Sequence, residues 1–402
     1  MSDKKVSVWN KNFTCVILAN LILCISFGAV QPQIASYSIF LSAGPLAMGF
    51  LAGMIYAISF VLKPFAGPAM TKLDNRMLLI VSFILGAIAH TGYALFQTLE
   101  MFFFFRFIHG LQFGLIGALF MTMAAASLPQ AKMAFGLGLI GFGIAVGSAL
   151  GPTISEAVLN YGRNYRDEGF GFMVVFLFGT VCHIVALIPA FIMSPDKKSK
   201  KEIESAGVWY KTIFSPHAVP VTIIMMLMMM ANSLINAYVF EFAGEQGIGN
   251  ASIFFVVYAV TMAISMPLSG NLADRFGVHR IVFPALAIFA VAMVVIGFST
   301  TLWMALLGAV LSGIGYGSSQ PAIQSMTLKM ESPVRRGVAS NTVFMGWDLG
   351  AVFGPLLGGM VVAHSSYSVM FKLGAIPLSL GIIGFAIVLP FYKRRLAEIS
   401  PL

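Results

Sequence analysis

Long apolar segments constrain this chain more than any other feature of its sequence. A helix needs about 20 mostly apolar residues to cross the roughly 30 Å hydrocarbon core of a bilayer. Hydrophobic residues make up 58% of the chain and charged residues only 10%, whereas a soluble domain carries about 25% charged residues. The sequence therefore predicts an all-α integral membrane protein with twelve transmembrane helices. We expect them at 14–36, 45–65, 77–97, 100–126, 135–158, 171–193, 217–240, 251–269, 281–299, 302–326, 338–362 and 369–391.

The basic residues are distributed unevenly between the connecting loops. If the N-terminus lies inside, 20 of the 24 Lys and Arg residues fall on the inner side, as the positive-inside rule requires. We expect a multi-pass protein of the plasma membrane with cytoplasmic N- and C-termini. The net charge of +9 then reflects topology, and nucleic-acid binding is not expected.

The two halves of the chain repeat each other. The polar stretch 194–216 separates six segments from six, and an offset of 203 residues aligns the halves without a gap. The aligned pairs are Pro64 and Pro267, Gly67 and Gly270, Gly110 and Gly313, Gly114 and Gly317, Gly143 and Gly346, Gly147 and Gly350, Gly151 and Gly354, and Pro152 and Pro355. This pattern indicates a parallel repeat of two six-helix halves. We expect an N-terminal bundle at 1–193, a cytoplasmic linker loop at 194–216 and a C-terminal bundle at 217–402.

Three short motifs of the chain follow patterns known from membrane proteins. One connection contains Gly270, Asp274, Arg275 and Gly277 in the order of the G-x-L-A-D-R-x-G signature, and its counterpart from Gly67 has Thr71 at the Asp position. Arg106 to Gly110 resembles the R-x-x-x-G segment. The glycines before Pro152 and Pro355 resemble the G-x-x-x-G-P segment of the twelve-helix drug:proton antiporters, although Ser155 and Glu156 replace the final glycines of the first copy. Together the three motifs resemble those of the major facilitator superfamily, and this resemblance implies two pseudo-symmetric six-helix bundles.

We interpret these motifs as gating elements. Glycines at i, i+4 and i+8 line one helical face and let two helix backbones approach closely, and a proline bends that face. The copies are Gly143, Gly147, Gly151 and Pro152, and Gly346, Gly350, Gly354 and Pro355. Static tight packing is the alternative. We expect Asp274 to contact the N-terminal end of the helix at 135–158, because a carboxylate is stabilised there; a solvated loop charge is the alternative.

Ionisable residues inside a membrane are costly and are functional candidates by default. The candidates for proton coupling are Asp348, Glu156 and His109. Burial disfavours the charged form of a carboxylate, so Asp348 can exchange protons near neutral pH. A hydrogen bond between helices is the alternative for Asp348, and neutral packing is the alternative for His109. Arg106 is expected to bind an anion or to tune a neighbouring acid, or else to donate to backbone carbonyls.

Amide and aromatic side chains complete a predicted substrate cavity. Besides Arg106 its candidates are Asn20, Gln112, Asn232, Asn236, Tyr238, Gln320, Gln324 and Trp347. The first segment carries no acid, which argues against a site for cationic drugs.

These features predict a secondary active transporter that moves a small organic solute by alternating access, with proton-coupled efflux as the leading interpretation. The alternatives are a proton-coupled symporter or uniporter importing a metabolite or organic anion, and a membrane receptor without transport. No nucleophile–base pair, metal-ligand spacing or phosphate-binding motif indicates an enzyme, a metal site or a cofactor. We expect a monomer whose partners are its substrate, protons and lipid.

Overall fold

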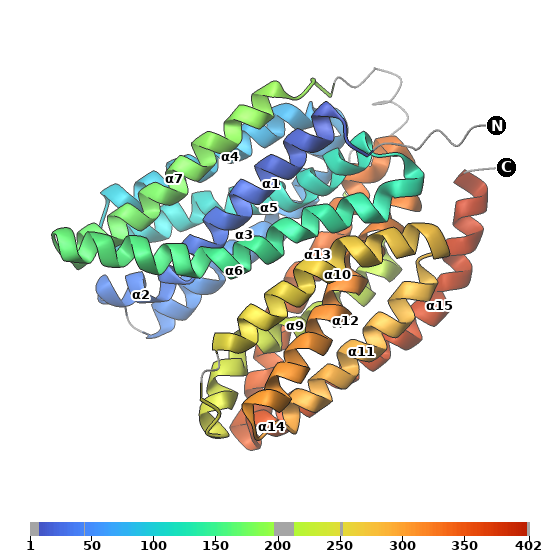
Figure 1. Ribbon diagram of the computed structural model, residues 1–402. Helices are drawn as coiled ribbons and strands as arrows, with labels where there is room; N and C mark the ends of the chain where they lie inside the picture. The colour runs from blue at the N-terminus through green and yellow to red at the C-terminus, as the bar shows by residue number, and fades with distance from the viewer. Residues whose placement is uncertain (1–7, 44, 197–212, 250–251, 400–402) are drawn as a thin grey trace. The chain divides into compact units, whose positions relative to one another are not determined.

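The computed structural model describes residues 8–43, 45–196, 213–249 and 252–399, and these residues form α-helices joined by short turns (Figure 1). Twelve helical stretches among them are long and apolar enough to cross a membrane. The predicted all-α class and the number of spans are therefore confirmed. The helices are α1 (Lys11–Val30), α2 (Gln33–Phe40), α3 (Pro45–Lys72), α4 (Asn75–Leu95), α5 (Leu99–Ser127), α6 (Met133–Tyr165), α7 (Glu168–Ile192), α9 (Val219–Glu245), α10 (Ser252–Phe276), α11 (His279–Gly297), α12 (Leu302–Lys329), α13 (Arg336–His364), α14 (Tyr367–Leu373) and α15 (Ala375–Ile399).

Short polar side chains mark where several helices begin. Asn10 accepts a hydrogen bond from the backbone N–H of Phe13, Asp167 from that of Phe170, and Thr301 from that of Met304. Each bond satisfies one of the N–H groups that have no partner inside the helix. Polar caps beside apolar runs therefore set the starts of α1, α7 and α12.

Three helix boundaries differ from those expected. The segment at 14–36 divides into α1 and α2, because Pro32 has no N–H to continue the helix. The last span likewise divides at Gly374 between α14 and α15. Asp274 and Arg275 lie in the last turn of α10 instead of in an interhelical turn. The turn itself is formed by Gly277, whose φ of +93° lies in the left-handed region that favours glycine.

The chain folds into two compact units. Unit 1 comprises Met1–Ser127 and Gly143–Ile213, and unit 2 comprises Leu128–Phe142 and Phe214–Leu402. The first turns of α6 thus belong to unit 2 and the rest of that helix to unit 1. The domain boundaries expected around 194–216 stay a prediction, because residues 197–212 of that stretch lie outside the described residues.

An aromatic cluster forms one part of the core of unit 1. Tyr37, on α2, packs against Phe102 of α5 and Phe172 and Phe176 of α7, with ring centroids 4.7–5.1 Å apart. All four side chains are fully buried, and aromatic rings at these separations add stability beyond their buried area. This cluster joins α2, α5 and α7.

Large apolar side chains remain exposed along the spans. Val181, Ile184 and Ile188 of α7 are 53–58% exposed, and Val260 and Ile264 of α10 are 51% and 62% exposed. A water-soluble protein rarely exposes such continuous apolar rows. These surfaces suit contact with lipid, and the chain is a multi-pass membrane protein.

Candidate functional site

The two glycine motifs bring helix backbones into direct contact. On α6, a Cβ at Gly143, Gly147 or Gly151 would overlap with Asn20, Cys24 or Gly28 of α1. On α13, a Cβ at Gly346, Gly350 or Gly354 would overlap with backbone oxygens of α9, those of Thr222, Met226 and Met230. Both motifs therefore lie at packed helix pairs, α6 with α1 in unit 1 and α13 with α9 in unit 2. Pro152 and Pro355 fall on the same two helices, inside α6 and α13.

Asp274 caps the start of a neighbouring helix in unit 2. Its Oδ2 accepts a hydrogen bond from the backbone N–H of Phe135, in the first turn of α6, at 2.8 Å. Its Oδ1 pairs with Lys329 Nζ at 2.9 Å, and the Asp274 side chain is only 2% exposed. The expected contact with the start of this helix is present, and a solvated loop charge does not describe this residue. Arg275 lies over the ring of Phe276, 5.2 Å from its centroid.

The corresponding motif of the first half makes its hydrogen bond within its own helix. Thr71, at the position of the missing Asp, donates its hydroxyl hydrogen to the carbonyl of Gly67 one turn earlier in α3 at 3.0 Å. The hydroxyl and carbonyl thus satisfy each other within one helix. Only the second copy carries the carboxylate that reaches another helix.

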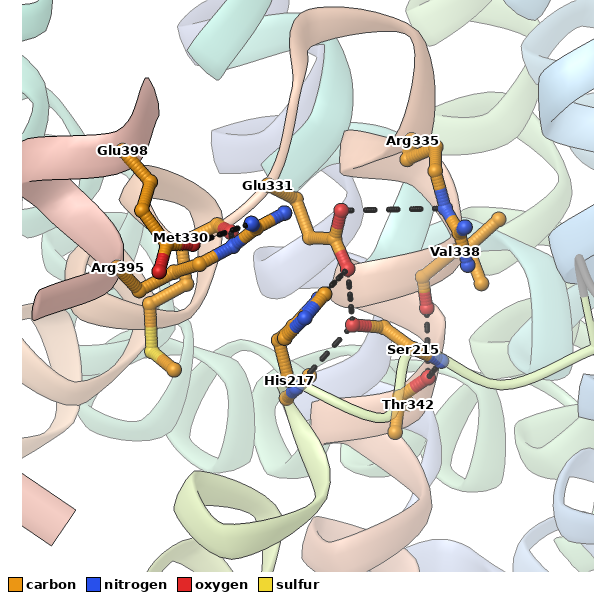
Figure 2. Close-up of polar contacts among 10 residues, drawn as sticks. Ser215, His217, Met330, Glu331, Arg335, Val338, Thr342, Arg395 and Glu398 are labelled. Carbon is orange, nitrogen blue, oxygen red and sulfur yellow. Dashed lines mark hydrogen bonds and ion pairs between the residues drawn. The ribbon is translucent and has the colours of Figure 1, made fainter. Parts of the chain in front are cut away.

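A second buried carboxylate, Glu331, holds two segments of unit 2 together (Figure 2). Its Oε1 accepts hydrogen bonds from Ser215 Oγ at 2.6 Å and His217 Nδ1 at 3.1 Å. Its Oε2 pairs with Arg335 Nε at 3.8 Å. Ser215 also donates its backbone N–H to Thr342 Oγ1 at 3.0 Å. The residues before α9 are thereby held to the connection between α12 and α13.

We call Ser215, His217, Glu331 and Arg335 the Glu331 cluster. The sequence analysis did not predict it, because charges at the ends of spans are usually solvated. The spacing of Glu331 and Arg335, i and i+4 between two long apolar segments, could have indicated an ion pair. The sequence analysis also missed Lys63, which is 3% exposed within α3 and donates to Ser59 Oγ at 2.9 Å. A lysine flanked by apolar residues on both sides was the signal there.

Arg106 is fully buried in unit 1. Its Nε and Nη2 donate to the carbonyl oxygen of Leu51 at 3.0 and 2.8 Å, and its Nη1 donates to Gln31 Oε1 at 3.4 Å. His109, one turn further along α5, contacts the hydroxyl of Tyr93 through Nδ1 at 3.2 Å. Donation to a backbone carbonyl, the structural alternative for Arg106, thus accounts for two of its nitrogens.

Two predicted cavity residues of unit 2, Asn232 and Tyr238, make hydrogen bonds to other helices. The hydroxyl of Tyr258 donates to Asn232 Oδ1 at 2.6 Å, and that of Tyr316 donates to Met229 Sδ at 3.5 Å. Tyr238 donates to the carbonyl of Pro355 at 2.8 Å. Asn232, Gln320, Gln324 and Asp348 are all at least nine-tenths buried.

The other predicted residues differ in their exposure. Glu156 and Asn236 are exposed on α6 and α9. Asn20 and Gln112 are buried in unit 1, and Trp347 is partly buried beside Asp348 on α13. The predicted set therefore divides between the two units, and its assignment to substrate or proton stays a prediction.

Comparisons with known proteins identify the family. The model of the Major Facilitator Superfamily matches residues 16–253 and 221–401. The multidrug resistance protein MdtG of Enterobacter lignolyticus is 26% identical over 396 residues, covering 93% of this chain and 91% of that protein. MdtG of Salmonella arizonae is 25% identical, with 99% and 100% covered.

Solved structures show the same fold. The human organic anion transporter MFSD10 (TETRAN) aligns with a TM-score of 0.73 at 15% identity, covering 93% of this chain and 98% of that one. The Escherichia coli fucose:proton symporter FucP aligns with a TM-score of 0.75 at 14% identity, covering 94% and 98%. The fold, the twelve spans and the matching family model together establish that this chain belongs to the major facilitator superfamily and is a secondary transporter, not an enzyme.

Proposed function

We propose that this chain exports small, largely apolar organic molecules in exchange for protons. The direction is supported by the full-length similarity to proteins named for multidrug resistance. The absence of an acid from α1 favours neutral over cationic substrates. In this proposal the protein is a monomer in the plasma membrane. Both termini, the Glu331 cluster and Asp274 lie on its cytoplasmic side.

The observation that carries proton coupling is the burial of Asp348. Its side chain is 1% exposed and lies near the middle of α13, a helix that is long and apolar enough to span the membrane. A carboxylate in such surroundings is costly and marks a functional site more often than a structural one. In the proposed cycle Asp348 takes up a proton from the outer side and releases it to the inner side.

The close helix contacts supply a means of alternating access. The glycine face of α6 contacts α1, and that of α13 contacts α9. The two helices of each pair can slide past each other because few side-chain atoms separate their backbones. Asp274 would hold the start of α6 in one state and release it in the other. Binding of a substrate or a proton shifts the balance between such states only if its affinity for them differs.

Asp348→Asn tests this proposal. Asparagine keeps the shape and the hydrogen-bonding capacity of the side chain but cannot ionise, so proton-driven accumulation should be lost while substrate exchange at equal pH persists. Glu100→Gln is the matched control, since Glu100 is an exposed carboxylate in the first turn of another spanning helix, α5. Its transport should stay within about twofold of wild type, as for most surface substitutions. Undiminished proton-driven accumulation by Asp348→Asn would rule out this residue as the proton carrier.

A further inference from the structure

Three of the six histidines of the chain contact one another in the interior of unit 1. His90 lies on α4, His109 on α5 and His183 on α7, and we call them the histidine cluster. The ring centroid of His90 is 4.7 Å from that of His109 and 4.6 Å from that of His183. Each of the three residues is at most 3% exposed.

Hydrogen bonds fix the state of two of these rings. His90 Nδ1 lies 2.7 Å from the carbonyl oxygen of Gly86, and His183 Nδ1 lies 2.8 Å from that of Gly179. A carbonyl only accepts, so each Nδ1 carries the hydrogen, and each neutral ring has a bare lone pair on Nε2. Both Nε2 atoms are buried and have no hydrogen-bond partner.

The His90 ring packs against a glycine of α7, and the His183 ring packs against a glycine of α4. A Cβ on Gly86 of α4 would overlap with the ring of His183, and a Cβ on Gly179 of α7 would overlap with the ring of His90. The helices α4 and α7 pack against each other within unit 1 (Figure 1). A buried acceptor without a partner is destabilising, so this packing retains two unfavourable lone pairs.

The groups that act electrostatically on the rings are one another and Arg106. The remaining titratable neighbour is Tyr93, whose ring packs on those of His90 and His109 and whose hydroxyl contacts His109. Within the described part of the chain, no group of His, Cys, Asp and Glu is arranged to hold a metal ion. A bare imidazole lone pair is basic and can bind a proton.

The second half of the chain shows that the fold does not need histidine at these positions. The repeat offset of 203 residues pairs His90 with Met293, His109 with Ser312 and His183 with Ala386. Met293 and Ser312 are fully buried in unit 2, so uncharged side chains fill the corresponding positions. The second half therefore forms the same helices without an ionisable side chain at these three positions.

We propose that the histidine cluster is a proton-binding site whose protonation opens the contact between α4 and α7. A proton from solution adds to the lone pair of a His90 or His183 Nε2 and leaves as a proton, with no other bond made or broken. The new N–H has no acceptor in the packed cluster, and the new charge is repelled by Arg106. The described arrangement is the unprotonated one, and acidification favours its opening. Use of this proton in transport rests on the proposed function, but its binding does not.

Titration of the full-length protein in lipid nanodiscs tests the site. His217→Gln, His279→Gln and His364→Gln together leave the histidine cluster as the only histidines. NMR of isotope-labelled histidine from about pH 8 to about pH 4, a range that extends below the ordinary titration of imidazole, should show at least one ring becoming protonated. Amide exchange in α4 and α7 should rise at least tenfold with the same midpoint. Three rings that stay neutral in a folded protein over this range would overturn the proposal.

Two variants separate proton binding from packing. His183→Gln and His90→Met, the latter the residue of the second half, should each shift the midpoint of the remaining rings by at least one pH unit, a tenfold change in proton affinity. An unchanged midpoint in a folded variant would show that the rings titrate independently and would overturn the shared site. If both fail to fold, His109→Ser provides the same comparison.

Asp348→Asn distinguishes this inference from the proposed function. In that variant the histidine cluster should still titrate although proton-driven transport is lost. Proton-driven transport by a wild-type protein with a silent histidine cluster would overturn this inference and leave the proposed function intact. Titration of the cluster in a wild-type protein that shows no proton-driven transport would support this inference and overturn the proposed function.

Discussion

Asp274→Asn should release the first turn of α6. Asparagine can still accept a hydrogen bond from the N–H of Phe135, but its amide cannot neutralise Lys329, whose side chain is 12% exposed and 2.9 Å away. A hydrogen bond to a charged group contributes about 1.5–3 kcal/mol and a neutral one about 0.5–1.5 kcal/mol, so the substitution costs about 1–1.5 kcal/mol. Since 1.36 kcal/mol corresponds to a factor of ten, the amide of Phe135 should exchange with solvent about 5- to 13-fold faster.

Hydrogen exchange resolved to the peptide containing Phe135 measures this directly, because exchange reports the free energy of local opening. Asp167→Asn is the matched control: Asp167 caps the N–H of Phe170 at 2.7 Å on the surface, where asparagine caps about as well as aspartate. Its peptide should change less than about threefold. Unchanged exchange at Phe135 in Asp274→Asn would refute the assignment of Asp274 to a charge-dependent contact.

Three further predictions concern gating, stability and topology. Gly151→Leu, whose Cβ would lie 2.5 Å from the Cα of Gly28, should insert into the membrane normally but slow transport at least tenfold. The control Gly53→Ala, with nothing within 4 Å of its Cβ, should transport normally. Equal transport rates for the two variants would show that α6 and α1 do not move relative to each other during transport. Glu331→Gln should lower the stability of unit 2 by about 1.5–3 kcal/mol in thermal unfolding, and Glu398→Gln, at an exposed position, should not. Equal melting temperatures for the two variants would contradict a stabilising role of the Glu331 cluster. Single cysteines replacing Ser194 and Asn164 in a cysteine-free background should label from opposite sides of the membrane, inside and outside; labelling of both from outside would refute the proposed orientation.

The spans were predictable from sequence because the bilayer requires about 20 mostly apolar residues in every helix that crosses it. Hydropathy alone gave the twelve segments, but it could not place the interruption at Pro32, where a missing N–H acts within an unbroken apolar run. The contact of Asp274 with the start of α6 followed from the preference of helix N-termini for carboxylates. Its partner Lys329 could not be predicted, since pairing across 55 residues depends on how α10 and α12 pack.

The histidine cluster was hidden for the same reason. His109 attracted attention as an ionisable residue inside a span, but the convergence of His90 and His183 depends on the rotation of three helices about their axes. A trace does exist in the sequence, because Gly86 precedes His90 and Gly179 precedes His183 by four residues each. That spacing suits a histidine that donates to the glycine carbonyl one turn earlier.

The central claim, proton-coupled export, is tested most directly by uptake into inverted vesicles. One pH unit provides about 1.4 kcal/mol, and 100 mV adds about 2.3 kcal/mol per charge moved, so one proton exchanged for a neutral substrate can sustain a roughly 500-fold gradient. With an acidic, positive interior and no ATP, vesicles containing the wild-type protein should accumulate a labelled apolar compound, and collapse of the gradient should release it. Equal uptake with and without the gradient, in vesicles that exchange the same compound at equal pH, would contradict proton-coupled export.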